Sequence, residues 1–326
     1  MIEKIRLIYL LAASHSGSTL TAMLLGAHPE ICTVGEIKAT SLGNIDLYRC
    51  SCREIINKCP FWHGIKQDMA IRGYDFDISK AGTDIRSGAN RYVIKLLRPL
   101  HRGVLLERVR DLLLSCSPNW RNNLPIIQTR NQTLLECIAH RTRVNTIVDS
   151  SKIGIRLKYL LKNPHIDVKV IRVIRDGRAV SLTYLNPASF ADAADPVLRQ
   201  GGMGGNRDSE KLSMENAAND WLRSIQEADA IIKTLPRNQW TQVRYEQLCS
   251  APEQTLKKLF SFIGVNSELI PASFRSVEHH IVGNGMRLDS TDEIILDERW
   301  KTELSDADLR TFNSIAGKTN HCLGYY

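Results

Sequence analysis

A polar loop near the N-terminus has the residue types needed to hold a phosphate group. The segment Ser14–Thr19 follows the apolar run Ile5–Ala12 and opens a helical pattern. Free backbone N–H groups and the helix dipole favour phosphate at such a position, and Ser18 and Thr19 add hydroxyl donors. No lysine follows Gly17, so the loop is not a Walker A motif. On its own, the pattern also fits an ordinary capped turn.

A second candidate phosphate contact follows a β-branched segment. Val168–Ile174 is typical of a strand covered on both faces, and Arg175 comes directly after it. Ligands of open α/β sheets bind at this end of the strands. Thr183 comes eight residues later, about two helical turns, so Arg175 and Thr183 could clamp one phosphate. The alternative is a helix-start ion pair that involves Asp176.

The charge of the chain is concentrated in one stretch. The 326 residues have a net charge of +8, and residues 140–178 contain ten Lys or Arg against three acidic residues, a balance of +7. Focused positive charge suits a polyanionic ligand. No nucleic-acid-binding signature is present, so we expect a small, highly phosphorylated ligand and no nucleic acid. A solvated basic helix face is the alternative.

Strands that alternate with helices predict an α/β fold with a parallel sheet covered by helices. The expected strands are Ile5–Ala12, Asn145–Val148, Val168–Ile174 and Trp240–Val243, and the expected helices include Ile153–Leu161, Asp176–Leu185, Met214–Leu235 and Pro252–Ile263. Residues 40–140 are mostly helical in pattern. We interpret them as a cap inserted in a single domain, 1–326. Pro187–Ser213 contains four glycines and shows no periodicity, which predicts a long functional loop. Our hypothesis is that this loop acts as a lid.

The ordered motifs resemble the PAPS-dependent sulfotransferase family, whose donor is 3′-phosphoadenosine 5′-phosphosulfate (PAPS). Ser14–Leu20 (SHSGSTL) is similar to the family's 5′-phosphosulfate loop, and Val170–Tyr184 (VIRVIRDGRAVSLTY) is similar to its 3′-phosphate motif. Further similarities are Val148–Lys152, Val243–Glu246 and Gly283–Arg287. The bacterial soluble members and the tyrosylprotein branch are the most similar. The resemblance implies a P-loop-like, three-layer α/β fold with a central parallel sheet.

The resemblance also implies roles for individual residues. The donor-binding residues would be Ser14, His15, Ser16, Gly17, Ser18 and Thr19 at the 5′-phosphosulfate, Arg175 and Thr183 at the 3′-phosphate, Tyr245 beside adenine, and Arg287 in a closing loop. His15 stands where the family usually has Arg or Lys. It could neutralise the leaving phosphate only when protonated, which a nearby phosphate favours.

The same resemblance assigns the catalytic groups. Glu36 is similar to the base of the tyrosylprotein branch, and Lys152 to a lysine near the bridging oxygen. An attacking alcohol must lose its proton, so a carboxylate base is chemically required. The implied reaction is in-line sulfonate transfer from PAPS to a hydroxyl or amine, with Glu36, Lys152 and His15 as catalytic residues and no metal. The alternative for Glu36 is a surface or capping glutamate.

Two other functions stay open at this stage. One is a kinase or other phosphotransferase, which the missing Walker lysine disfavours, and the other is a non-catalytic nucleotide-binding protein. The acceptor is open among small molecules, oligosaccharides, lipids and peptides, and the cap and lid are expected to form its pocket. The longest apolar run is too short for a membrane span, and no signal-peptide layout is apparent. We therefore expect a cytoplasmic protein.

Three of the eight cysteines lie close together in the sequence. Cys50, Cys52 and Cys59 are followed by His63, and three cysteines with a histidine could bind zinc. The Cys-x-Cys start is tighter than the usual ligand spacing, so we favour reduced thiols or a local disulfide. His279-His280 has no ligand partner at metal spacing and reads as plain loop.

Overall fold

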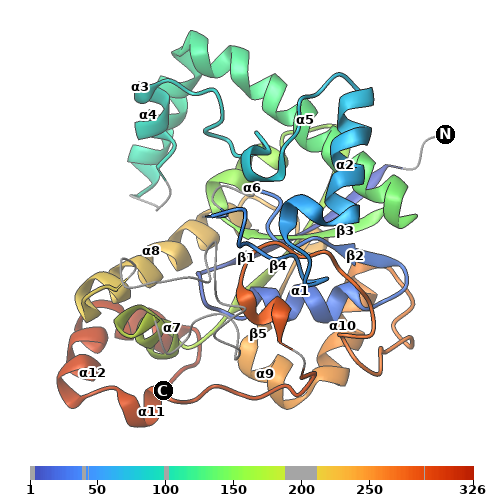
Figure 1. Ribbon diagram of the computed structural model, residues 1–326. Coiled ribbons are helices and arrows are strands. Elements are labelled where there is room, and N and C mark those ends of the chain that lie inside the picture. The colour runs from blue at the N-terminus through green and yellow to red at the C-terminus, as the bar shows by residue number, and fades with distance from the viewer. Residues whose placement is uncertain (1–3, 39–41, 43, 99–102, 188–210, 290) are drawn as a thin grey trace.

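The structure is a computed structural model that describes residues 4–38, 42, 44–98, 103–187, 211–289 and 291–326. Its centre is a five-stranded parallel sheet in the order β2-β3-β1-β4-β5 (Figure 1). The strands are β1 (Ile5–Ala12), β2 (Ile31–Thr33), β3 (Thr146–Lys152), β4 (Ile166–Ile174) and β5 (Trp240–Arg244). This confirms the predicted fold class.

The central strand β1 is apolar on both faces because each face supports a separate core. Leu7, Tyr9 and Leu11 belong to one hydrophobic cluster, whereas Ile8 and Leu10 belong to another. Side chains of a strand point alternately to the two faces, so a strand buried on both sides needs a continuous apolar run. The sequence of β1 meets this requirement at each of these positions.

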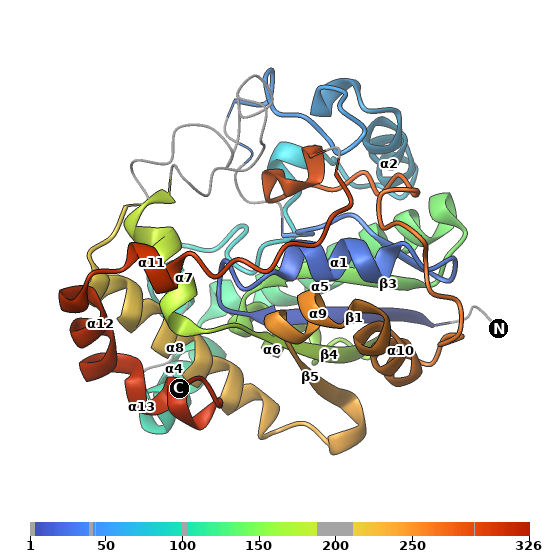
Figure 2. The ribbon, with the colours of Figure 1, turned by 90° about the horizontal axis from the view of Figure 1, so that it is seen from below.

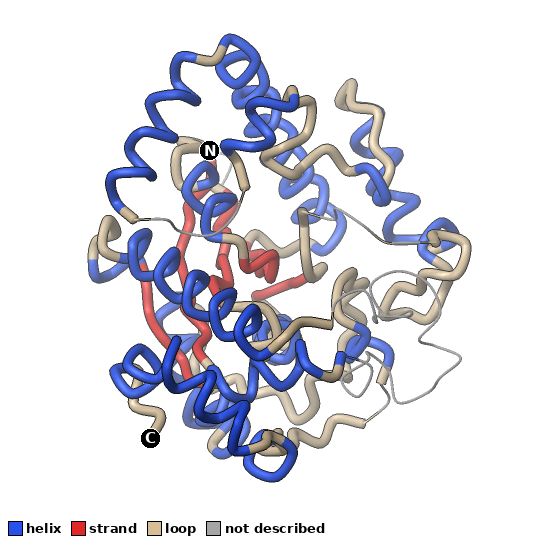
Figure 3. The backbone as a smooth tube through the Cα atoms, turned by 90° about the vertical axis from the view of Figure 1, so that its left-hand side faces the viewer, coloured by secondary structure: helices blue, strands red, loops and turns tan. Residues whose placement is uncertain are grey.

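Helices cover both faces of the sheet (Figures 2 and 3). The first core packs against α2 (Pro60–Ile71), α5 (Pro118–Thr142), α6 (Gly154–Leu160) and α8 (Met214–Ile232). The second packs against α1 (Ser18–Gly26), α9 (Tyr245–Ser250) and α10 (Pro252–Ile263). The layers are therefore helix, sheet and helix.

The remaining helices flank these layers. They are α3 (Arg91–Leu96), α4 (Val104–Cys116), α7 (Gly177–Leu185), α11 (Trp300–Glu303), α12 (Asp306–Phe312) and α13 (Lys318–Cys322), with a π-helical turn at Asn313–Gly317. Trp221 of α8 and Phe312 of α12 join a third hydrophobic cluster beneath α7. Among the described helices, none is both long and apolar enough to cross a bilayer.

The predicted elements match the structure closely where the pattern is strong. The strand at Ile5–Ala12 and the helix at Pro252–Ile263 have the expected bounds. The three-residue strand β2 was not predicted, because so short a run carries no periodicity. The helices α2 to α5 lie between residues 60 and 142, so they fall in the segment 40–140 expected to form a cap, except that α5 ends two residues beyond it. Most of the expected lid, residues 188–210, lies outside the described residues.

A buried ion pair closes the carboxyl end of β3. The Arg156 guanidinium lies 3.3 Å from Asp149 Oδ2, and both side chains are almost completely buried. Arg156 also donates to Thr83 O at 2.6 Å and to Asn131 Oδ1 at 2.8 Å. The other Asp149 oxygen accepts from the backbone N–H of Ile37 at 3.3 Å. The network thus joins β3, α5, α6 and the segment after β2.

We predict that Asp149→Ala destabilises the protein strongly, because it leaves the buried Arg156 charge without its partner. The free energy of unfolding should fall by about 3–5 kcal/mol, measured by urea denaturation followed by circular dichroism. The matched control is Asp167→Ala, which removes an exposed carboxylate 3.7 Å from Arg6. Exposed pairs contribute about 0–1 kcal/mol. Equal, small losses in both variants would contradict this view of the network.

Candidate active site

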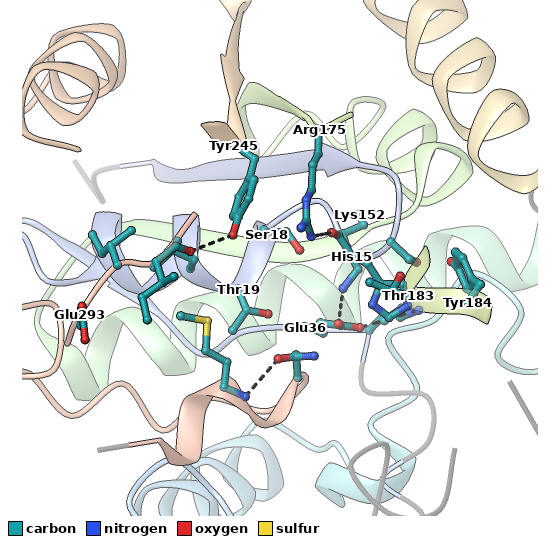
Figure 4. Close-up of a pocket in the computed structure, with 18 residues that line it drawn as sticks. His15, Ser18, Thr19, Glu36, Lys152, Arg175, Thr183, Tyr184, Tyr245 and Glu293 are labelled. Carbon is teal, nitrogen blue, oxygen red and sulfur yellow. Dashed lines mark hydrogen bonds and ion pairs between the residues drawn. The ribbon is translucent and has the colours of Figure 1, made fainter. Parts of the chain in front are cut away.

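A cavity of about 370 Å³ opens where the loops after β1, β3 and β4 meet (Figure 4). Its lining residues come from segments spread along the chain: Ser14, His15, Gly17, Ser18, Thr19, Leu20, Glu36, Lys38, Lys152, Arg175, Thr183, Tyr184, Tyr245, Asn284, Met286, Glu293, Ile294 and Ile295. The carboxyl edge of a parallel sheet is the expected place for a ligand. The size is typical of a pocket for a small molecule.

The loop after β1 takes a conformation that points its backbone into the cavity. His15 and Gly17 have positive φ angles, 61° and 83°, and Gly17 is the N-cap of α1. A Cβ at Gly17 would lie 2.4 Å from the Tyr245 ring, so only glycine fits here. The N-terminus of α1, with the Ser18 and Thr19 side chains, therefore faces the cavity and favours an anion.

Arg175 is held in place by residues far away in the sequence on either side of it. It donates to His15 O at 2.9 Å, and it lies 3.1 Å from Asp297 Oδ2. Its guanidinium also lies 4.4 Å from the centre of the Tyr245 ring. Burial raises the pKa of Tyr245, so its hydroxyl stays protonated at neutral pH. Thr183 shares the cavity with Arg175, and its hydroxyl donates to Val180 O at 2.6 Å.

A carboxylate and two lysines gather at the other side of the cavity. The Lys152 ammonium donates to Glu36 Oε1, and the Lys38 ammonium lies 3.9 Å from Glu36 Oε2. Glu36 is only 6% exposed. Burial lowers the pKa of Lys38; the Glu36 carboxylate partly opposes this shift, and the Lys152 charge adds to it. The cluster therefore offers a proton acceptor beside two cations.

Most residues singled out in the sequence meet in this one cavity. Two that were assigned to the nucleotide do not line it. Ser16 is buried beneath the loop, and the Arg287 guanidinium donates to Gly283 O and to Arg49 O at 2.8 Å. Their nucleotide contacts stay predictions. Sequence reasoning missed Lys38, although its place two residues after Glu36 was a usable signal.

The basic segment 140–178 has a narrower role than its charge suggested. Of its ten Lys and Arg side chains, only Lys152 and Arg175 are among the residues that line the cavity. Several others pair with acidic residues elsewhere, such as Lys158 with Asp111 and Arg172 with Asp229. The excess charge is thus mostly neutralised locally.

One prediction about the cysteines was wrong. His280, which had read as plain loop, lies beside Cys50, Cys52 and Cys59, with all four candidate ligand atoms within 4.8 Å of one another. The candidate His63 is exposed, and its ring lies 3.1 Å from the Gln67 amide instead. The described cysteines are all free thiols in this structure.

The fold and site together define a three-layer α/β protein with a cavity at the carboxyl edge of its sheet. A model of the Sulfotransferase family matches residues 126–268. Carbohydrate sulfotransferase 2 of Mus musculus is 31% identical in an alignment of 159 residues, which covers 40% of this chain and 29% of that protein. The Homo sapiens protein is 30% identical over 159 residues, with the same shares.

A solved structure has a similar fold over nearly the whole chain. The sulfotransferase domain from the curacin biosynthetic pathway has a TM-score of 0.50 and 16% identity, and the match covers 96% of this chain and 97% of that one. The chain is thus similar to the sulfotransferase family over residues 126–268, and it shares the α/β fold of this solved sulfotransferase domain. It spans less than a third of the length of the curated relatives that it matches.

We predict that Gly17→Ala weakens the binding of adenosine 3′,5′-bisphosphate at least about tenfold, or 1.4 kcal/mol. The new methyl group would meet the Tyr245 ring, and the loop would have to move away from the cavity. Calorimetric titration measures the affinity. The control is Gly73→Ala, because Gly73 has a similar φ of 82° but no atom within 4 Å of the added carbon. Equal affinities in both variants would refute the prediction.

Proposed function

We propose that this protein transfers a sulfonate group from PAPS to an acceptor hydroxyl or amine. The observation that carries the proposal is the position of Glu36 and Lys152 in the cavity that also receives the N-terminus of α1. One end of the cavity thus offers an anion site, and the other offers a carboxylate beside cations. Sulfonate transfer needs both, since the donor is anionic and the acceptor must lose a proton.

The donor would be held by groups from three strand ends. The α1 N-terminus, with Gly17, Ser18 and Thr19, would receive the 5′-phosphosulfate, and Arg175 with Thr183 the 3′-phosphate. Tyr245 would lie beside the adenine ring, where its ring already contacts Arg175. His15 takes a left-handed conformation in the loop, and its ring packs edge-on against Tyr184 at 4.8 Å. When protonated, it would add positive charge near the leaving phosphate.

The transfer itself would be a single in-line displacement. The acceptor oxygen or nitrogen forms a bond to sulfur while the bond between sulfur and the bridging oxygen breaks. Glu36 takes the acceptor proton, and adenosine 3′,5′-bisphosphate leaves. Lys152, which contacts Glu36 in this structure, would turn to the bridging oxygen and stabilise its growing negative charge. Lys38 would keep a second positive charge beside the carboxylate.

The curated relatives suggest where to look for the acceptor. Both are named carbohydrate sulfotransferases. We therefore propose a carbohydrate hydroxyl as the first acceptor class to test, ahead of other small molecules, lipids and peptides. Asn284 and Met286 line the cavity from the C-terminal segment.

The donor assignment predicts a specific order of nucleotide affinities. Adenosine 3′,5′-bisphosphate should bind at least about tenfold more tightly than ADP, because Arg175 forms charge-assisted hydrogen bonds with the 3′-phosphate. Calorimetric titration of both ligands, and of ATP with magnesium, measures this order. Arg175→Met should remove the preference. Tighter binding of ATP with magnesium, and none of the bisphosphate, would favour phosphoryl transfer and refute the proposal.

Glu36→Gln should separate nucleotide binding from transfer. The amide keeps the shape of the carboxylate but cannot accept the proton, so kcat should fall by about 10²–10⁴-fold, while the bisphosphate still binds. Transfer of labelled sulfonate from PAPS to a carbohydrate, alcohol and amine panel measures kcat. The control is Glu253→Gln on the exposed start of α10. Unchanged transfer in Glu36→Gln would exclude this residue as the base.

A further inference from the structure

Four potential metal ligands converge outside the cavity described above. Cys50 and Cys59 are completely buried, and Cys52 and His280 are partly buried. The cysteines come from the segment before α2, whereas His280 comes from a segment more than two hundred residues later. Among the described residues, these four side chains form the cluster whose ligand atoms lie close enough together to hold a metal ion.

The distances within the group fit one tetrahedral ion. Zinc lies about 2.3 Å from sulfur and about 2.0–2.1 Å from nitrogen, so tetrahedral geometry puts two sulfurs about 3.8 Å apart and sulfur about 3.6 Å from nitrogen. Cys52 Sγ and Cys59 Sγ are 3.6 Å apart. His280 Nδ1 lies 3.5 Å from Cys59 Sγ and 3.9 Å from Cys50 Sγ.

Two residues in the turns that carry these candidate ligands have strained backbone conformations. Cys50 and Cys52 lie in a tight turn in which Arg53 has a φ of 67° and donates its N–H to Cys50 O at 2.9 Å. His280 also has a positive φ, 49°. Such conformations cost of order 1–3 kcal/mol in a non-glycine residue and persist where the surroundings fix them. Both strained residues belong to the turns that carry the candidate ligands.

The surroundings orient the histidine toward the sulfurs. The Phe61 ring stacks on the His280 ring, with centres 4.6 Å apart and planes within 5°. Trp62 Nε1 donates to His280 O at 3.1 Å. These two contacts hold the plane of the His280 ring and its backbone beside the sulfurs.

We propose that Cys50, Cys52, Cys59 and His280 bind one Zn²⁺ ion at a structural site. The four protein ligands complete the tetrahedron, which is the pattern of a structural rather than a catalytic zinc. On binding, the three thiols release their protons to solvent, and His280 coordinates through Nδ1 in its neutral form. The site is independent of the proposed transfer reaction.

The zinc would fasten the C-terminal strap, residues 278–288, to the segment before α2. Beyond His280, Ile281 N donates to Ser51 Oγ at 2.7 Å, and Gly283 N donates to Tyr48 OH at 2.8 Å. The strap then reaches the candidate active site, since Glu36 N donates to Val282 O at 3.0 Å. The ion would therefore stabilise the backbone beside Glu36.

The metal content of the full-length protein tests the proposal directly. After purification from zinc-containing medium without chelators, elemental analysis should find about one zinc per chain. Titration of wild-type protein with a mercurial reagent should release that zinc as the thiols react. Zinc-free protein with a Cys52–Cys59 disulfide, free thiols that fail to bind added zinc, or a different bound metal would each overturn the assignment.

Variants assign the ligands. Cys59→Ser and His280→Ala should weaken zinc binding at least about a hundredfold, whereas His280→Cys should retain the ion because four thiolates also form a structural site. The matched control is Cys116→Ser, which removes an exposed thiol outside the group. Because Cys59→Ser could fail to fold, Co²⁺ exchanged into the wild-type protein gives a second readout, the visible absorption of tetrahedral thiolate coordination. Its absence would overturn the proposal.

Hydrogen exchange tests whether the zinc ion holds the strap in place. Removal of zinc with a chelator should increase amide hydrogen exchange across residues 278–288, while exchange in α10 stays unchanged. Equal exchange in the strap with and without zinc would show that the ion does not hold it.

Discussion

The buried carboxylate of Asp149 is the constraint on which the site depends. It stands at the carboxyl end of β3, where one oxygen meets Arg156 and the other receives backbone N–H groups from Ile37 and Ser151. Those two amides are sequence neighbours of Glu36 and Lys152. A single desolvated charge therefore fixes the backbone on both sides of the ion pair that faces the cavity.

The parallel sheet brings the residues of the cavity together at one edge. Each strand ends at the same edge, so residues far apart in sequence reach the cavity from short, well-anchored loops. Two cores, one on each face of β1, hold the strands in register. The loop after β1 and the Glu36–Lys152 ion pair are therefore positioned by the packing of the sheet and its two cores.

The sequence predicted what depends on local pattern. The continuous apolar run Ile5–Ala12 and the amphipathic helix Pro252–Ile263 follow from residues close in the chain, and the family resemblance pointed to Glu36 and Lys152. The sequence could not predict the contact between His280 and Cys59, because these residues are 221 positions apart and only the fold brings them together. The strand Ile31–Thr33 was too short to show periodicity. For Arg287 the motif was visible in the sequence, but the contacts of its side chain were not. Its guanidinium donates hydrogen bonds to the backbone carbonyls of Gly283 and Arg49.

The ion pair between Arg175 and Asp297 has a consequence for ligand selection. Under the proposed function, the 3′-phosphate arrives at a guanidinium that already has a carboxylate partner at 3.1 Å. An incoming group must compete with that internal anion, and a doubly charged phosphate competes better than a neutral hydroxyl or a singly charged group. Asp297 would thus sharpen the selection, because a nucleotide without the 3′-phosphate leaves the Arg175–Asp297 pair intact and gains no contact with the guanidinium.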